Sequence, residues 1–257
     1  MASIWNPQQY DKFRNERSAP FYDLLALVRP VPGGRVADLG CGTGALTADL
    51  HRHSQAAETI GIDSSETMLA EAAGHAGEGL RFEQRDIAAF APARPFDVVF
   101  SNAALQWVDA HEQLFTRITH AVAPGGQLAV QVPANADHPS HVAARAVAEE
   151  EPFASAMGCY TRTWPVQSPE WYAELLDRLG YAEQSVRLQV YGHHLPSREA
   201  VIEWVRGTYL TDYQRRMPDA LFEQYLARYR EVLLPQLDDR RPFFYAFKRI
   251  LIWGRRA

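Results

Sequence analysis

Cysteines, long apolar runs and basic stretches are all scarce in this chain of 257 residues. The two cysteines, Cys41 and Cys159, lie far apart and show no C-x-x-C or Cys/His ligand spacing, so the sequence predicts neither a disulfide framework nor a metal site. The longest apolar runs, such as 98–100 and 250–253, are far too short to span a bilayer. We therefore expect a cytoplasmic protein that does not enter a membrane.

A surplus of positive charge is also missing, because 31 acidic residues outnumber 26 lysines and arginines and give a formal charge of −5. Since no sustained basic stretch offsets this charge, we expect no nucleic-acid partner. Apolar residues, by contrast, make up 47% of the chain, which is enough for a real core. This length and composition fit one large α/β domain with insertions, which we expect to be a monomer.

The segment from Val36 to Gly44 is the most informative part of the sequence, because an apolar strand runs directly into a glycine-rich turn. Gly40, Gly42 and Gly44 alternate and leave one face of the turn without Cβ atoms, so a ligand can come close to the backbone. The helix expected over about 45–52 directs its first N–H groups to the same place. The pattern predicts a site for a nucleoside cofactor.

Two classes of cofactor fit this turn. Gly40, Gly42 and Ala45 satisfy the G-x-G-x-x-G/A pattern of dinucleotide-binding folds. Asp38, two positions before G-x-G-x-G, instead matches the pattern for S-adenosylmethionine. A carboxylate beside the turn repels a pyrophosphate but attracts an ammonium or sulfonium group. The charge of Asp38 therefore favours S-adenosylmethionine.

The next predicted strand, 59–63, ends in the carboxylate of Asp63 about twenty residues after the glycines. An acidic group at this place can accept hydrogen bonds from both ribose hydroxyls. Ser64 and Ser65 then cap a helix that runs through Met68.

Polar residues also follow the third and fourth predicted strands, 80–84 and 96–100. Asp86 can accept a hydrogen bond from the adenine amino group, and Ile87 can contact the adenine ring. Asn102 follows the fourth strand. Because ligands of open α/β sheets bind beyond the carboxyl ends of the strands, we expect these residues to surround one site.

These motifs, in this order over 32–133, resemble those of class I S-adenosylmethionine-dependent methyltransferases. Within that superfamily the chain is similar to the trans-aconitate methyltransferases, and that similarity extends to segments such as 5–7, 16–18, 102–107, 139–142, 195–197 and 243–256. The resemblance implies a Rossmann-like doubly wound seven-stranded sheet with an antiparallel last strand. It further implies the cofactor S-adenosyl-L-methionine and esterification of one carboxylate of a small tricarboxylic acid, trans-aconitate.

The resemblance and the motifs together give the expected cofactor-binding residues: Tyr10, Arg17, Asp38, Gly40, Cys41, Gly42, Asp63, Ser64, Met68, Asp86, Ile87, Asn102, Ala103 and Trp107. We expect no catalytic acid or base, because the accepting carboxylate is already ionised near pH 7. The other carboxylates of the acceptor require cationic and polar partners. The expected substrate-binding residues are His141, Arg145, His193, Trp204 and Tyr209, with Arg162, Arg198 and Tyr160 as further possibilities.

Three regions are expected along the chain: an N-terminal helical segment over 1–31, a cofactor-binding core over 32–133, and a last region over 134–257. Helices are predicted within 5–28 and over 138–151, 197–209 and 219–234, and strands over 186–194 and 243–254. The helices beyond residue 133 interrupt the regular α/β order. We expect these insertions to form a helical cap that holds the acceptor.

Two alternatives remain open from the sequence. The accepting group could be another small or carrier-linked carboxylate, such as a malonyl thioester. The protein could also bind S-adenosylmethionine without catalysis. Calorimetry separates the second alternative from an enzyme, because a binding protein takes up the cofactor but turns over no acid.

Overall fold

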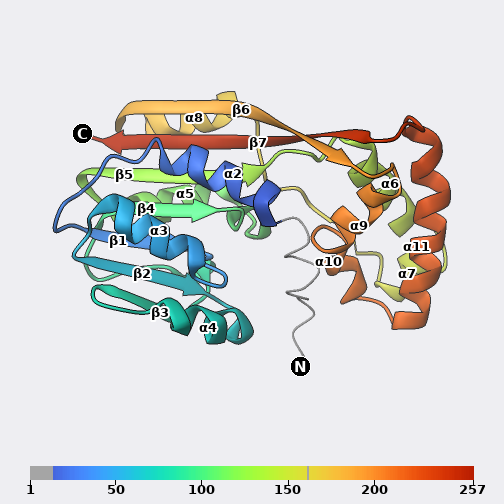
Figure 1. Ribbon diagram of the computed structural model, residues 1–257, viewed down its shortest axis with the longest axis horizontal. Helices are drawn as coiled ribbons and strands as arrows, with labels where there is room; N and C mark the ends of the chain where they lie inside the picture. The colour runs from blue at the N-terminus through green and yellow to red at the C-terminus, as the bar shows by residue number, and fades with distance from the viewer. Residues whose placement is uncertain (1–13, 161) are drawn as a thin grey trace. The chain divides into compact units, whose positions relative to one another are not determined.

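Seven strands form one mixed sheet in the computed structural model, which describes residues 14–160 and 162–257 (Figure 1). The strand order is β3-β2-β1-β4-β5-β7-β6. The strands are β1 (Arg35–Leu39), β2 (Glu58–Asp63), β3 (Leu80–Gln84), β4 (Phe96–Asn102), β5 (Val122–Pro133), β6 (Tyr181–Leu195) and β7 (Phe243–Arg256). Strands β1 to β5 pair in parallel, and β7 pairs antiparallel with β5. The predicted fold class is confirmed.

The chain folds as two compact units. The core unit comprises Arg17–Pro133, Pro165–Gln189 and Arg249–Ala257, and the helical unit includes Ala134–Trp164 and Val190–Lys248. Among the described residues, no helix combines the length and the apolar character needed to cross a membrane.

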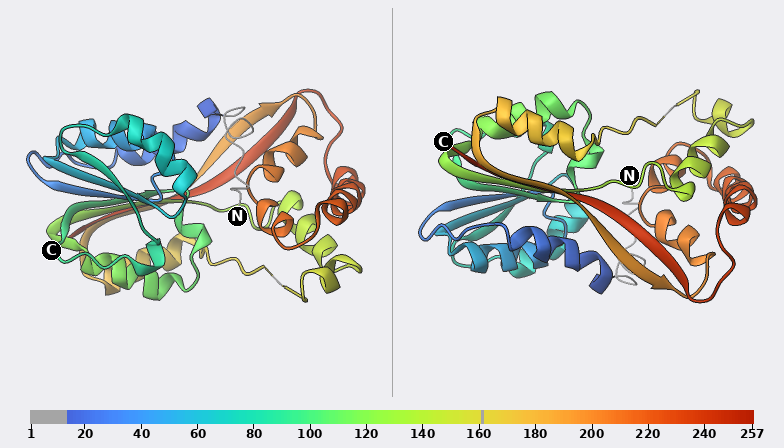
Figure 2. Two further views of the ribbon diagram at one scale, coloured as in Figure 1. Left: turned by 90° about the horizontal axis from the view of Figure 1, so that it is seen from below. Right: turned by 90° about the horizontal axis from the view of Figure 1, so that it is seen from above.

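Both faces of the sheet in the core unit are covered by helices, which explains why its central strands are apolar throughout (Figure 2). One face carries α2 (Arg14–Leu25), α3 (Ala45–Ser54) and α4 (Glu66–Ala72), and the other carries α5 (His111–His120) and α8 (Pro169–Arg178). Phe21 and Leu24 of α2 pack with Val98 and Phe100 of β4 in a buried cluster. On the opposite face, the Tyr172 hydroxyl of α8 lies 2.5 Å from Nδ1 of His111 in α5.

The helical unit contains α6 (Pro139–Ala148), α7 (Phe153–Ala156), α9 (Ala200–Arg206), α10 (Thr211–Gln214) and α11 (Asp219–Leu233). Its core is rich in tyrosines, and two of them bond to backbone carbonyls of α6. Tyr225 of α11 donates to the carbonyl of Ala144 (2.8 Å), and Tyr229 donates to the carbonyl of Ser140 (2.9 Å). These two bonds fasten α11 to α6, since buried hydroxyls need partners.

Most predicted elements are present, but two differ in extent. The helix predicted over 197–209 is wrong in length, because α9 ends at Arg206 and Gly207 caps it. The strand predicted over 186–194 is longer, because β6 begins at Tyr181, whose hydroxyl lies 3.1 Å from that of Thr119. The predicted N-cap Ser65 is confirmed, since its side chain accepts a hydrogen bond from the N–H of Met68, three residues later.

Candidate functional site

The turn after β1 is held in a left-handed conformation and is tied to β2. Gly40, Gly42 and Gly44 have φ angles of +80°, +54° and +77°. The N–H groups of Gly40 and Cys41 donate to the carbonyl of Ile62, at 2.8 and 3.0 Å. Both bonds join the turn to the adjacent strand, so the backbone before α3 is rigid without any ligand.

The three glycines serve different purposes. A Cβ at Gly40 would overlap that of Ala104, and a Cβ at Gly44 would lie 2.7 Å from the ring of Phe82. These two glycines are therefore required by packing within the protein. A Cβ at Gly42 would meet nothing within 4 Å. The backbone at Gly42 thus borders open space, and a ligand can approach it there.

Asp63 ends β2 beside this open space, as predicted. Its Oδ2 accepts a hydrogen bond from the N–H of Gly42 (3.0 Å), and its Oδ1 accepts one from the N–H of Ser65 (2.9 Å). A carboxylate has about four acceptor sites, so roughly two remain for a ligand. Asp63 is partly exposed. Its position and its spare lone pairs suit a pair of ribose hydroxyls.

Asp38 is buried rather than open at the mouth of the turn, where the sequence alone placed it. Its Oδ2 accepts a hydrogen bond from the hydroxyl of Thr47 in α3 (2.7 Å). Burial raises the pKa of Asp38 to about 7; the bond from Thr47 opposes this rise, and the charge of Asp63 adds to it. The carboxyl of Asp38 therefore binds a proton far more tightly than an exposed aspartate does, and a nearby cation shifts the balance toward the anion.

Asp86 and Ile87 follow β3 at the next position along the sheet. Asp86 is exposed and caps the short helix η2 (Ile87–Ala89), accepting from the N–H of Ala88 at 2.8 Å. Ile87 is partly buried, and its Cδ1 lies 3.6 Å from the position of a Cβ at Gly40. Ile87 therefore offers an apolar contact beside the turn.

The segment after β4 supplies an acceptor without a partner. Oδ1 of Asn102 is buried and has no hydrogen-bond partner within the described part of the chain. The next residue, Ala103, has a φ of +54°, and its N–H donates to the carbonyl of Gln131 (2.9 Å). Trp107 ends the short helix η3 (Leu105–Trp107) and is 43% exposed. An N–H group of a ligand would give this oxygen the hydrogen bond that it lacks.

Most of the predicted cofactor residues fall into two groups. Asp38, Asp63, Asp86 and Asn102, at the ends of β1 to β4, present oxygen acceptors. Cys41, Ser64 and Met68 lie in the turn or at the start of α4. Tyr10 and the side chain of Arg17 fall outside the described residues. Because acceptor oxygens attract cations and repel phosphates, this group of residues fits a cationic nucleoside and opposes a dinucleotide.

The predicted substrate residues all lie in the helical unit, in two clusters. The ring of His141 packs on that of Tyr209, with a centroid distance of 4.4 Å, and on that of Trp164 at 5.9 Å. The ring of His193 packs on that of Trp204 at 4.8 Å. Tyr245 lies between the two clusters, because its ring packs on that of Trp204 at 5.7 Å and on that of His138 at 4.9 Å.

Neither the buried His141 of α6 nor the half-buried His138, which caps this helix, carries a charge at pH 7. Burial lowers the pKa of His141 to about 3, and the nearby charges of His138, Arg162 and Arg145 lower it further. Burial likewise lowers the pKa of His138, the N-cap of α6, to about 4. At pH 7 these rings can donate or accept a hydrogen bond but contribute no positive charge. Any cationic role in this cluster falls to arginines.

Two arginines, Arg145 and Arg162, line one small cavity of about 10 Å³ together with Ala148, Glu149, Tyr160 and Tyr213. Both terminal nitrogens of Arg145 donate to the carbonyl of Ala136 (3.1 Å each). Arg162 is buried over the ring of Tyr209, donates to its carbonyl (2.8 Å) and lies 3.7 Å from Asp212. This volume holds about one water-sized group.

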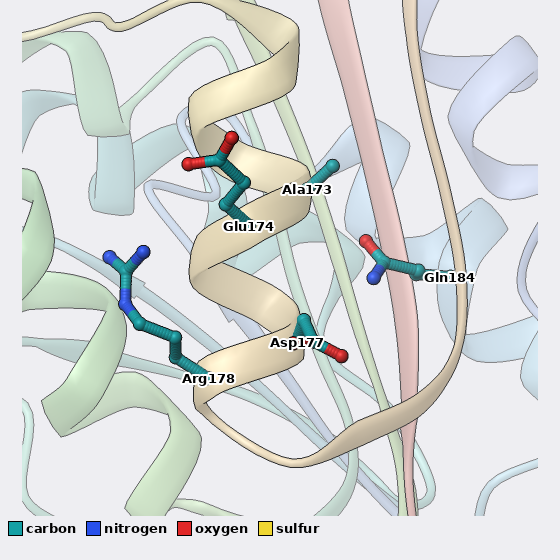
Figure 3. Close-up of a pocket in the computed structure, with 5 residues that line it drawn as sticks. All are labelled: Ala173, Glu174, Asp177, Arg178 and Gln184. Atoms are coloured by element: carbon teal, nitrogen blue, oxygen red, sulfur yellow. The ribbon is translucent and has the colours of Figure 1, made fainter.

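A larger hollow, of about 480 Å³, lies at the far edge of the sheet between α8 and β6 (Figure 3). Ala173 and Asp177 of α8 face Gln184 of β6 across it, and Glu174 and Arg178 of α8 complete its lining. In the strand order, β4, β5 and β7 separate β6 from β1. The hollow is open to the surface, and its lining includes no residue of the turn at Gly42.

Gly42→Ala tests whether the open space at the turn receives the cofactor. Gly33→Ala is a matched control, because Gly33 also has a positive φ (+73°) and also has nothing within 4 Å of a Cβ. Both variants should lose about 1–2 kcal/mol of stability from backbone strain. Only Gly42→Ala should weaken S-adenosylmethionine binding, by at least about tenfold. Equal affinities of the two variants in calorimetry would contradict the assignment.

Asp38→Asn tests the buried charge. The folded protein keeps this proton up to about pH 7, whereas an unfolded aspartate releases it near 4, so Asp38 lowers the free energy of unfolding as pH rises from 4 to 7. The uncharged variant should therefore melt at a higher temperature than the wild type at pH 8 but not at pH 4. It should also bind S-adenosylmethionine more weakly at pH 8. A difference in melting temperature that is the same at both pH values would count against this reading.

The comparisons with known proteins agree with this geometry. A family model described as "Methyltransferase domain" matches residues 36–126. The trans-aconitate 2-methyltransferase of Deinococcus radiodurans is 43% identical to this chain, over 98% of each sequence. That of Escherichia coli O1:K1 / APEC is 37% identical and covers 99% of each.

Among solved structures, an S-adenosylmethionine-dependent methyltransferase from Mesorhizobium loti shares the fold, with a TM-score of 0.52 and 24% identity over 93% of this chain and 98% of that one. The identities of 43% and 37% extend over nearly the whole length of both relatives. The chain therefore belongs to the trans-aconitate 2-methyltransferase family, within the class I S-adenosylmethionine-dependent methyltransferases.

Proposed function

We propose that this protein transfers a methyl group from S-adenosylmethionine to a carboxylate of trans-aconitate and forms the monomethyl ester. The observation that carries the proposal is the set of acceptor oxygens around the open backbone of Gly42, in a chain 43% identical to a trans-aconitate 2-methyltransferase. Asp38, Asp63 and Asn102 attract a cationic donor and repel a dinucleotide.

The cofactor, when bound, supplies a methyl group on a positively charged sulfur. Asp63 would accept hydrogen bonds from the ribose, and Asp86 with Ile87 would hold the adenine. The unpartnered Oδ1 of Asn102 would accept from the ammonium group. Cys41, Ser64, Met68, Ala103 and Trp107 are proposed as further contacts, as are Tyr10 and Arg17.

The reaction needs no proton transfer, because a carboxylate acceptor is ionised at pH 7. One C–O bond forms as one C–S bond breaks, and a negative and a positive charge cancel. Loss of charge makes the step faster where water is excluded. Alignment of the reacting groups contributes further, on the order of 7–11 kcal/mol in well-oriented pairs. The protein's task is therefore to hold and orient both substrates.

The acceptor carries carboxylates that are not methylated, and these need partners. We propose Arg145 as the main one, because its guanidinium bonds only to a backbone carbonyl among the described residues and lines a cavity with Arg162. His141, His193, Trp204 and Tyr209 are proposed as polar and aromatic contacts. His141 would act as a neutral hydrogen-bonding ring, since its pKa is lowered to about 3.

We also propose that the enzyme works as a monomer in the cytoplasm, without a nucleic-acid partner. Both Cys41 and Cys159 are free thiols, and Cys159 is exposed. Free exposed thiols are typical of a reducing compartment. The net charge of −5 gives no attraction toward nucleic acid.

The activity is tested by incubating the purified protein with methyl-labelled S-adenosylmethionine and a panel of di- and tricarboxylic acids. Trans-aconitate should become labelled most efficiently, and mass spectrometry should identify a monomethyl ester. The identity of the ester also shows which carboxylate accepts the methyl group. Uptake of the cofactor without methylation of any acid would support the binding protein instead, and preference for another acid would correct the acceptor.

Arg145→Ala tests the proposed hold on the acceptor. Removal of a charge-assisted hydrogen bond should raise KM for trans-aconitate by about 10- to 100-fold, and by less for an acid with fewer carboxylates. Arg228→Ala is the control, because Arg228 of the same unit is exposed and pairs with Glu150 and Glu231. Equal effects of Arg145→Ala on both acids would remove the assignment.

A further inference from the structure

Gln131 is a buried polar residue at the carboxyl end of β5, next to the proposed cofactor residues. It is fully buried, and it pairs in register with Asn102 of β4. Paired residues of neighbouring strands point to the same face of a sheet. On that face of β5, Ala129 packs against Phe21 and Leu50 beneath α2 and α3. The side chain of Gln131 therefore lies on the same face of the sheet as that of Asn102, whose Oδ1 has no partner among the described residues.

One end of the Gln131 amide is fixed by Arg249. The buried Arg249 of β7 donates from Nη1 to Oε1 of Gln131 at 3.1 Å. A guanidinium can only donate, so the amide oxygen must face Arg249 and the NH₂ group must point away from it. The positions of the amide oxygen and nitrogen of Gln131 are therefore fixed by the bond from Arg249.

The other end of the amide has no partner. Within residues 14–160 and 162–257, Nε2 of Gln131 makes no hydrogen bond, although it is buried. Buried polar groups in proteins nearly always have partners, and an exception calls for a ligand or a water. Asn102 and Pro133, which neighbour Gln131 on this face, are partly exposed, so open surface begins one residue away. Nε2 requires an acceptor, and a carboxylate oxygen is a strong one.

Gln127 shows what the same residue does four positions earlier on the same strand and face. Its Oε1 accepts from the N–H of Arg29 (2.8 Å) and from Nε1 of Trp253 (3.2 Å), and its Nε2 donates to the carbonyl of Arg29 (2.9 Å). Both ends of that amide are satisfied within the protein. Burial on this strand does not by itself leave a glutamine NH₂ group without a partner. The unpartnered donor is specific to Gln131, at the carboxyl end of β5.

The strand order places Gln131 where an acceptor is needed. Asp86, Asp63, the glycine turn and Asn102 follow β3, β2, β1 and β4 in that spatial order, and β5 comes next. If adenine and ribose lie toward β3 and β2, the methyl-bearing end lies toward β4. We propose that Nε2 of Gln131 donates a hydrogen bond to a carboxylate oxygen of the bound acceptor. This inference rests on the proposed function.

Gln131→Glu tests the inference, because glutamate has the same shape and keeps the bond from Arg249 but replaces the donor with a negatively charged acceptor. Calorimetry measures trans-aconitate binding to the enzyme with S-adenosylhomocysteine, which cannot transfer a methyl group, and S-adenosylmethionine binding alone. We expect trans-aconitate affinity to fall by about 10- to 100-fold and S-adenosylmethionine affinity to change less than twofold. KM for trans-aconitate should rise in parallel.

Gln127→Glu is the matched control, and it should lower the melting temperature without changing trans-aconitate affinity. If Gln131→Glu does not fold, Gln131→Met removes the donor without adding charge and should weaken trans-aconitate binding by about tenfold. Unchanged trans-aconitate affinity would overturn the inference. Weaker S-adenosylmethionine binding, alone or to the same degree, would also overturn it, because the amide would then serve the carboxylate of the cofactor or the fold. Absence of wild-type turnover with trans-aconitate would instead refute the proposed function.

Discussion

The hydrogen bond from the N–H of Gly42 to Oδ2 of Asp63 connects the two features on which the candidate site depends. It joins the one glycine of the turn that borders open space to the carboxylate at the end of the next strand. With the bonds from Gly40 and Cys41 to Ile62, it holds the turn against β2 by contacts within the protein. A site that is already ordered loses less conformational entropy when the cofactor binds.

Electrostatics separates the two units of the chain. The core unit places Asp38, Asp63 and Asp86 around the turn, and burial keeps the first of these close to its neutral form with a pKa of about 7. A cationic cofactor would restore its charge, so binding and ionisation are coupled. In the helical unit, Arg145 and Arg162 provide positive charge while the buried histidine beside them stays neutral. The core unit thus places carboxylates at the turn, and the helical unit places two arginines beside an uncharged histidine.

Local patterns explain what the sequence predicted well. Strand ends, such as the position of Asp63 at the end of β2, and caps such as Ser65 depend on residues close in the chain, so spacing and residue type were enough. The burial of Asp38 could not be read in this way, because it depends on packing beneath α3. The different roles of Gly40 and Gly42 depend on Ala104, more than sixty positions away. The helix over 197–209 was predicted too long, because helical periodicity did not show that Gly207 would end it.

Gln131 illustrates the limit of sequence reasoning and the value of hydrogen-bond satisfaction. It interrupts the apolar run 128–132, which marks it as unusual, but its partner Arg249 lies 118 positions later. The sequence shows two glutamines four positions apart. Only the structure shows that both are buried, and that the side-chain amide of Gln127 makes hydrogen bonds at both ends and that of Gln131 at one. Positions that break a rule of stability without local compensation are where function is expected. In this core unit, Asn102 and Gln131 pair in register on neighbouring strands, one with an unpartnered acceptor and the other with an unpartnered donor among the described residues.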